Sequence, residues 1–136
     1  MKAFVRKVNY YETDKMGITH HSNYIRFMEE ARIDFLTNIG WGFDKLEAAG
    51  LVSPVLSITC DYKQSTTFAD ELKIIVNTEK FSGLKFVINY TMKCGDKVVC
   101  TASSTHVFMD KNGRPVFLEK QYPDFYKALT ETKVEE

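Results

Sequence analysis

The sequence predicts an α+β fold in which one long central helix is wrapped by a curved antiparallel sheet. Three observations predict it: a helical apolar pattern over residues 22–39, alternating apolar and polar residues in the second half of the chain, and tight turn signals between those alternating runs. Consecutive strands joined by tight turns are antiparallel, and one long helix can cover a face of such a sheet. The 136 residues fit one domain, residues 1–136.

The elements are expected in the order strand, long helix, short helix and four long strands. The expected strands cover residues 3–9, 52–64, 70–81, 84–92 and 98–109, and the short helix lies within residues 41–50. Turn signals occur at Ser82-Gly83, at residues 94–97 and at residues 111–113. Near the end of the chain, Pro123 marks the first turn of another helix, a position at which proline is tolerated.

The long helix is predicted from residues that recur at steps of three and four. Its apolar stripe consists of Tyr24, Phe27, Met28, Ala31, Phe35 and Ile39, widened by Ile25 and Leu36. Ser22 or Asn23 is expected to cap its start, since each offers a side-chain oxygen to the unpaired N–H groups there. Gly40 is expected to end it, because glycine tolerates the left-handed conformation of a helix C-terminus.

Composition excludes several classes of function. The 18 basic residues equal the 18 acidic ones, so no electrostatic footprint for non-specific nucleic-acid binding exists. The three cysteines, Cys60, Cys94 and Cys100, form no C-x-x-C pair, and each lies in an apolar run that favours a buried thiol. No apolar leader segment or membrane-spanning run is present. We therefore expect a soluble, cytoplasmic protein with no membrane span and no nucleic-acid partner.

The chemistry-bearing residues gather in one stretch, YYETDKMGITHHSNY, just before the long helix. The Asp14 carboxylate can act as a general base or as a nucleophile. Gly17 allows close backbone approach to a substrate, and the N–H groups of a helix start can polarise a carbonyl. These are the parts that acyl transfer or hydrolysis requires.

Two other interpretations of this stretch are open on local spacing. It can be an ordinary turn and helix cap, since acid-x-acid before glycine is common in turns. It can also be a metal site, although His20 and His21 are adjacent and His106 is the remaining histidine, whereas zinc usually takes three or four protein ligands. No metal is therefore predicted. His106 alternates with apolar residues in a strand, which favours a core histidine whose hydrogen bonds are satisfied.

The stretch resembles the loop of the hotdog-fold acyl-CoA thioesterases, specifically the 4-hydroxybenzoyl-CoA thioesterase-like group. The matching pattern is Tyr11-x-Thr13-Asp14-x-x-Gly17-Ile18-x-x-His21-x-Asn23-Tyr24. Similar segments continue along nearly the whole chain, at residues 27–32, 54–55, 62, 68–70, 102–110 and 113–115. The family's long helix enclosed by a sheet also agrees with the element order predicted above.

The resemblance implies hydrolysis of an acyl-CoA to free acid and CoA, without a cofactor. Asp14 takes the position of the catalytic carboxylate, as nucleophile or base, and His21 that of a catalytic histidine in one branch, with a backbone N–H near it polarising the carbonyl. Implied substrate-binding residues are Gly17, Asn23, Tyr24 and Ser65. Ser65 stands where many family members have proline, at a pocket edge that a neighbouring subunit supplies. Glu29 and Glu30 occupy the helix that carries the acid in another branch, and here they are expected to be structural or solvent-facing.

The family also implies a homodimer or homotetramer with active sites at the subunit interface. Two other functions stay open for such a fold. One is a thioesterase for acyl carrier protein thioesters, which a basic patch at the pocket mouth would favour. The other is a non-catalytic module that binds acyl-CoA.

Overall fold

The computed structural model describes residues 1–80 and 83–135, and its elements follow the predicted order. The strands are β1 (Phe4–Lys7), β2 (Val55–Tyr62), β3 (Glu71–Lys80), β4 (Phe86–Cys94) and β5 (Lys97–His106). The helices are the 3-10 turn η1 (Tyr10–Glu12), α1 (Ser22–Asn38), α2 (Phe43–Ala48), α3 (Leu118–Gln121) and α4 (Pro123–Glu131). Phe81 and Ser82, predicted as a strand end and a turn, lie outside the described residues.

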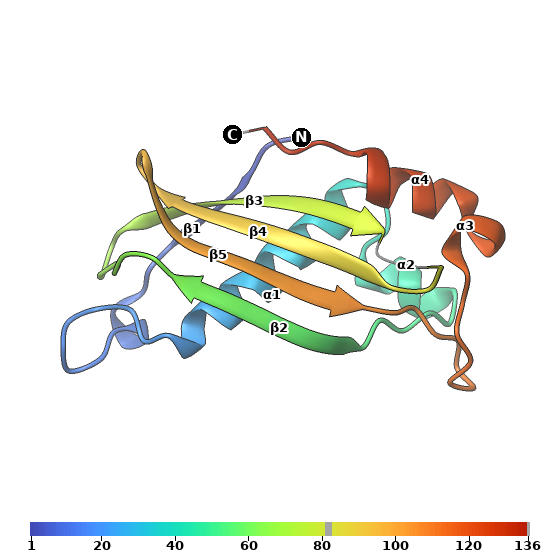
Figure 1. Ribbon diagram of the computed structural model, residues 1–136, viewed down its shortest axis with the longest axis horizontal. Coiled ribbons are helices and arrows are strands. Elements are labelled where there is room, and N and C mark those ends of the chain that lie inside the picture. Colours follow the sequence, from blue (N-terminus) through green and yellow to red (C-terminus); the bar gives the residue numbers. More distant parts are fainter. Residues whose placement is uncertain (81–82, 136) are drawn as a thin grey trace.

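The five strands form one antiparallel sheet in the order β1-β3-β4-β5-β2 (Figure 1). The predicted turn between β4 and β5 is confirmed, since Cys94 pairs with Lys97 across it. β2 pairs with β5 rather than with its successor β3, and β1 pairs with β3. No tight turn links β1 or β2 to these partners, so local turn chemistry does not specify the two outer positions of the sheet.

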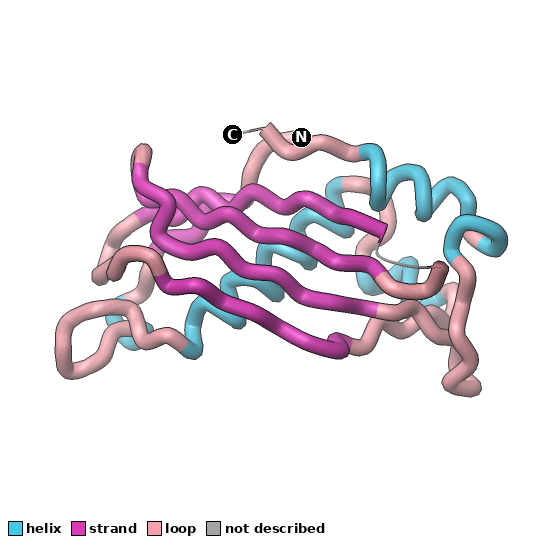
Figure 2. Tube along the Cα trace, in the orientation of Figure 1, coloured by secondary structure: helices cyan, strands magenta, loops and turns pink. Residues whose placement is uncertain are grey.

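Helix α1 crosses one face of the sheet (Figures 1 and 2). Most of its predicted stripe is buried, and the following members are at most 3% exposed: Tyr24, Phe27, Met28, Ala31 and Phe35. Ile39, the last predicted member, follows the end of α1 and is half-buried. Alternate residues of the sheet are equally buried, among them Leu72, Ile74, Tyr90 and Met92, each at most 1% exposed. A side chain of this size contributes about 1.5–3 kcal/mol when fully buried. The contact between stripe and sheet therefore forms the core that the helix pattern predicted.

Ile25 was predicted to widen the buried stripe. This prediction is wrong, because the residue is 43% exposed. Leu36, predicted for the same role, is 3% exposed. At about 100° per residue the two side chains point in similar directions from the helix axis. They differ because α2 packs against α1 at its C-terminal end, where Leu36 lies.

The C-terminal end of α1 confirms the role predicted for Gly40. Gly40 has φ +87°, and its N–H donates to Thr37 O (3.1 Å), while the N–H of Trp41 donates to Leu36 O (2.9 Å). This pair of bonds is the glycine-terminated helix end that the sequence predicts. Trp41 then stacks on Phe125 of α4 at 4.6 Å between ring centroids, which fixes the C-terminal helices against this end of α1.

Candidate active site

Asp14 lies at the start of a short hairpin-like loop before α1. The N–H of Asp14 donates to Ile18 O (2.9 Å), and Gly17, with φ +78°, donates to Asp14 O (2.9 Å). One carboxylate oxygen of Asp14 accepts the Met16 N–H (2.8 Å), and no hydrogen bond to the other is made by any described residue. The loop thus fixes the direction of a half-buried carboxylate and leaves one of its oxygens available. Gly17 supplies the positive φ of the turn.

A buried ion cluster anchors this loop to β1 and α1. Arg6 makes two parallel hydrogen bonds to the Glu12 carboxylate (2.8 and 2.6 Å), and its Nε donates to Glu30 (2.7 Å). Glu12 is 3% exposed, and it also accepts the Asn9 N–H (2.7 Å). Bonding to Glu30 and Glu12 raises the pKa of Arg6 above its ordinary value. Sequence reasoning missed Arg6, because no spacing rule connects these residues.

The start of α1 differs from the predicted cap. Ser22 and Asn23 are already helical, and His21 is the residue that precedes them without a side-chain cap of its own. The Nδ1 atom of His20 instead accepts the Ser22 N–H (3.3 Å) and contacts Ser22 Oγ (2.8 Å). Asn23 points back to the loop, where its amide donates to Glu12 O (2.9 Å). The prediction failed because both candidates follow the helix boundary by a residue or more.

A pocket of about 310 Å³ opens beside the loop and the start of α1. Four predicted site residues line it, namely Asp14, His21, Tyr24 and Ser65. Gly17 and Asn23 are not part of its lining. The remaining lining residues come from the loop, from the end of β2 and from the segment after it: Met16, Ile18, Thr19, Tyr62, Lys63 and Gln64. The structure therefore brings the predicted acid and histidine to one pocket. Gly17 belongs to the loop beside it, and Asn23 lies in α1 and hydrogen bonds to that loop.

Two tyrosines form the inner wall of the pocket. Tyr24 is 3% exposed, and its hydroxyl shares a hydrogen bond with Thr66 (2.8 Å), which in turn contacts Thr19 (2.7 Å). Burial raises the pKa of Tyr24, so this hydroxyl stays protonated near neutral pH. Tyr62 packs edge-on against Tyr24 at 5.3 Å and donates to His21 O (3.3 Å). The wall is rigid and largely uncharged, which suits an acyl group.

The N–H groups at the start of α1 are mostly occupied. Asn23 N–H donates to His20 O (3.0 Å), and Tyr24 N–H donates to His21 O (3.2 Å). The His21 N–H, by contrast, makes no hydrogen bond to any described residue. It is thus an unpaired backbone donor at the start of α1, beside the pocket that His21 lines.

No group of three or more His, Cys, Asp or Glu side chains among the described residues is arranged to hold a metal ion. None of the described helices is both long enough and apolar enough to cross a membrane.

Comparison with known proteins gives consistent results. The model of the thioesterase-like superfamily matches residues 8–131. A putative esterase of Aquifex aeolicus is 37% identical over 122 residues, covering 90% of this chain and 94% of the relative. The putative acyl-CoA thioesterase YneP of Bacillus subtilis is 30% identical over 129 residues, covering 93% of this chain and 94% of the relative. Among solved structures, DHNA-CoA thioesterase from Staphylococcus aureus superposes with a TM-score of 0.84 at 29% identity, covering 93% of this chain and 87% of that one.

Proposed function

Because the chain belongs to the thioesterase-like superfamily, has the hotdog fold and is a thioester hydrolase, we propose that it hydrolyses an acyl-CoA to the free acid and CoA. Relatives named for acyl-CoA or DHNA-CoA support CoA as the leaving group. The observation that carries the proposal is the Asp14 carboxylate, which is held by the loop with one oxygen free beside the pocket.

Each group in the pocket has a role in this proposal. The His21 N–H hydrogen bonds to the thioester carbonyl oxygen and stabilises the negative charge that develops on it. The free oxygen of Asp14 attacks the carbonyl carbon or removes a proton from the water that attacks it. The carbon–sulfur bond then breaks, and CoA leaves as a thiolate that takes up a proton. If Asp14 is the nucleophile, the acyl group is left on its carboxylate as an anhydride, and a water molecule hydrolyses this anhydride to release the free acid and restore Asp14. The His21 imidazole assists proton transfer at the mouth of the pocket.

Replacing Asp14→Asn tests the proposal. The asparagine oxygen can still accept the Met16 N–H, so the loop is expected to persist while turnover falls by roughly 10²–10⁴-fold. Release of CoA thiol is measured with a panel from acetyl-CoA to palmitoyl-CoA, with aromatic acyl-CoA esters and with an acyl carrier protein thioester.

A matched control is Asp110→Asn. Asp110 holds a distant turn by the same chemistry, its carboxylate accepting the N–H groups of Asn112 (2.9 Å) and Arg114 (3.0 Å). Its replacement is expected to leave turnover unchanged. Equal turnover in wild type and Asp14→Asn would contradict the catalytic role of Asp14, and faster turnover of the carrier-protein thioester would change the proposed substrate.

We also propose that the active form is a homo-oligomer in which a second copy covers β2. This edge strand exposes Val55, Leu56, Ile58 and Tyr62 to the extent of 42%, 49%, 37% and 48%. An exposed apolar edge strand is a template for pairing with another chain. β2 leads directly into the pocket residues 62–65, so the partner would complete the pocket mouth. Sedimentation of wild type and Leu56→Lys, with activity measured in parallel, tests this: the variant is expected to be monomeric and inactive.

A further inference from the structure

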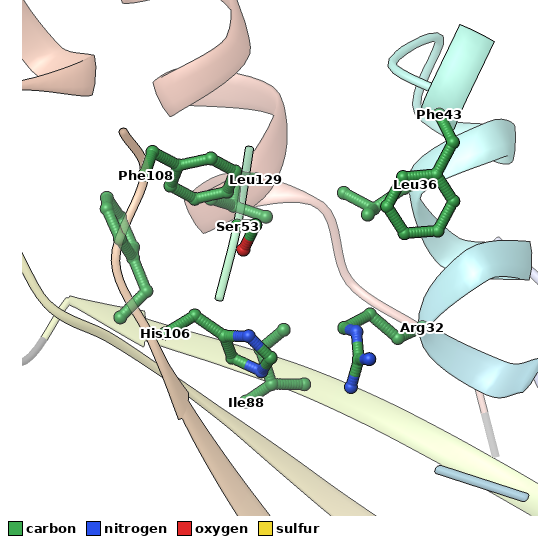
Figure 3. A pocket seen from close by; sticks show the side chains of 9 residues that line it. Arg32, Leu36, Phe43, Ser53, Ile88, His106, Phe108 and Leu129 are labelled. Carbon is green, nitrogen blue, oxygen red and sulfur yellow. The ribbon is translucent and has the colours of Figure 1, made fainter. Parts of the chain in front are cut away.

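A second hollow lies beside the C-terminal half of α1, away from the candidate active site. It is a cavity of about 30 Å³ between α1, α2, α4 and the sheet. Most of its lining is apolar, and its polar lining residues are Arg32, Ser53 and His106 (Figure 3). Arg32 and Ser53 are half-buried, whereas His106 is 1% exposed. The cavity therefore has a partly open rim that carries a cation and a buried floor that carries an imidazole.

A chain of hydrogen bonds connects rim and floor. An Nη atom of Arg32 donates to the Tyr90 hydroxyl (3.3 Å), which contacts Ser104 Oγ (2.7 Å), and Ser104 Oγ contacts His106 Nε2 (2.7 Å). Tyr90, Ser104 and His106 are each at most 1% exposed. The Nδ1 atom of His106 is buried and has no hydrogen-bond partner among residues 1–80 and 83–135. His106 is thus a core histidine as predicted, but the prediction that its hydrogen bonds are satisfied is wrong for one of its two nitrogens.

The hydrogen-bond chain from Arg32 to His106 has one proton more than its links can use. Burial, and secondly the Arg32 charge, lower the pKa of His106 to about 4, so the ring is neutral near pH 7 and carries one proton. Tyr90, Ser104 and His106 then contribute three protons to the two links between them. One proton is left over in every arrangement, and a buried donor without an acceptor is unfavourable because it has lost its hydrogen bond to water. Because Arg32 donates to the Tyr90 oxygen, the Tyr90 hydroxyl donates to Ser104 Oγ, and the Ser104 hydroxyl donates to His106 Nε2. The proton of the His106 ring is then on Nδ1, and it is the spare proton.

Arg32 has no anionic partner among the described residues. The hydrogen bond that it donates within this part of the chain goes to the neutral Tyr90 hydroxyl. In Figure 3 its guanidinium and the His106 ring face each other across the cavity. The cavity thus presents a cation and a buried N–H donor, and its other lining is apolar except for Ser53.

We propose that this cavity binds a short monocarboxylate, whose oxygens accept hydrogen bonds from Arg32 and from His106 Nδ1. A carboxylate accepts at both oxygens and supplies the charge that Arg32 lacks. A volume of about 30 Å³ has room for about two water-sized groups, so formate and acetate are the expected ligands, and longer or aromatic acids are expected to be excluded. The site lies apart from the candidate active site and does not depend on the proposed thioesterase mechanism.

The full-length protein is titrated at pH 7 with sodium formate, acetate, butyrate or benzoate, with sodium chloride at equal ionic strength as the reference. Formate and acetate are expected to raise the melting temperature in a saturable way, by about 3–6 °C at ten times the Kd. In ¹⁵N-histidine-labelled protein they are expected to shift the Nδ1 resonance of His106, with His20 and His21 as internal references. Butyrate, benzoate and chloride are expected to do neither.

Arg32→Met removes the charge and keeps most of the side-chain stem, so it is expected to abolish the acetate response. Arg26→Met is the matched control, because Arg26 is a cation of the same helix that does not line the cavity, and it is expected to retain the response. No saturable effect of formate or acetate on the wild-type protein would overturn the proposal and leave the cavity to water alone. An undiminished response in Arg32→Met would overturn it as well. If Arg32→Met does not fold, the proposal is tested by the His106 Nδ1 resonance of the wild-type protein. A saturable shift of this resonance with formate or acetate supports the proposal, and no shift overturns it.

Discussion

The two hollows along α1 differ in how they are built. The pocket at the start of the helix takes its acid and its histidine from one continuous stretch, Asp14 to His21, held in place by backbone turns. The cavity at the other half joins Arg32 to His106, two residues that lie far apart in the sequence on α1 and β5. A loop site can therefore be detected from its sequence, whereas a site between packed elements becomes visible only when the sheet order is known.

The largest expected effect concerns Arg6, which anchors the loop beside the candidate active site to β1 and α1. Arg6→Met would leave the Glu12 carboxylate buried without its cation, and removing one partner of a buried pair costs about 3–5 kcal/mol. Because Glu12 O also accepts from Asn23 and from His20, turnover is expected to fall along with stability. Urea unfolding and CoA release measure the two effects.

The double variant Arg6→Met/Glu12→Gln is the control for this prediction. Glutamine is neutral and can still accept the Asn9 N–H, so the double variant is expected to regain part of the stability that Arg6→Met loses. A double variant less stable than Arg6→Met would show that the charge of Glu12 is not the cause of the loss.

The second prediction concerns the pH dependence of stability at the other hollow. His106 has a pKa of about 4 in the native state against 6.5 ordinarily, so between these values the unfolded chain binds a proton that the native state does not. Stability from this residue is complete above pH 6.5 and falls as the pH is lowered toward 4, by about 3 kcal/mol in all. The free energy of unfolding, measured from pH 7 to pH 4.5, is expected to fall less steeply in His106→Gln than in wild type. Parallel profiles would exclude His106 as a source of the slope.

The smallest expected effects distinguish the two adjacent histidines of the loop. His20→Ala removes the acceptor of the Ser22 N–H and is expected to cost about 1 kcal/mol of stability while turnover stays within about threefold. His21→Ala is expected to lower turnover by roughly tenfold and to leave stability nearly unchanged, since the side chain is exposed. Melting temperature and kcat of both variants are compared directly. The reverse pattern, with His20 controlling turnover, would exchange their roles.

Much of the fold could be predicted from local patterns. The stripe of α1 and the alternation along β4 are periodic signals, and Gly40 ends the helix as its conformational freedom predicts. Ile25 was mispredicted because a helix pattern indicates direction around the axis but not which neighbours cover it. The cap was mispredicted because Ser22 and Asn23 are the first two residues of α1, whereas a capping residue precedes the helix.

Asp14 and His21 could be identified as candidate site residues before the fold was known, because the residues that resemble the thioesterase loop are contiguous, at positions 11–24. The other parts of the candidate site depend on the tertiary structure. The Arg6 anchor and the chain from Arg32 to His106 depend on which strands become neighbours, and the burial of a whole sheet face selects those neighbours. Hydrogen bonds between distant residues leave no periodic trace in a sequence, and so their geometry emerges only when the chain is folded.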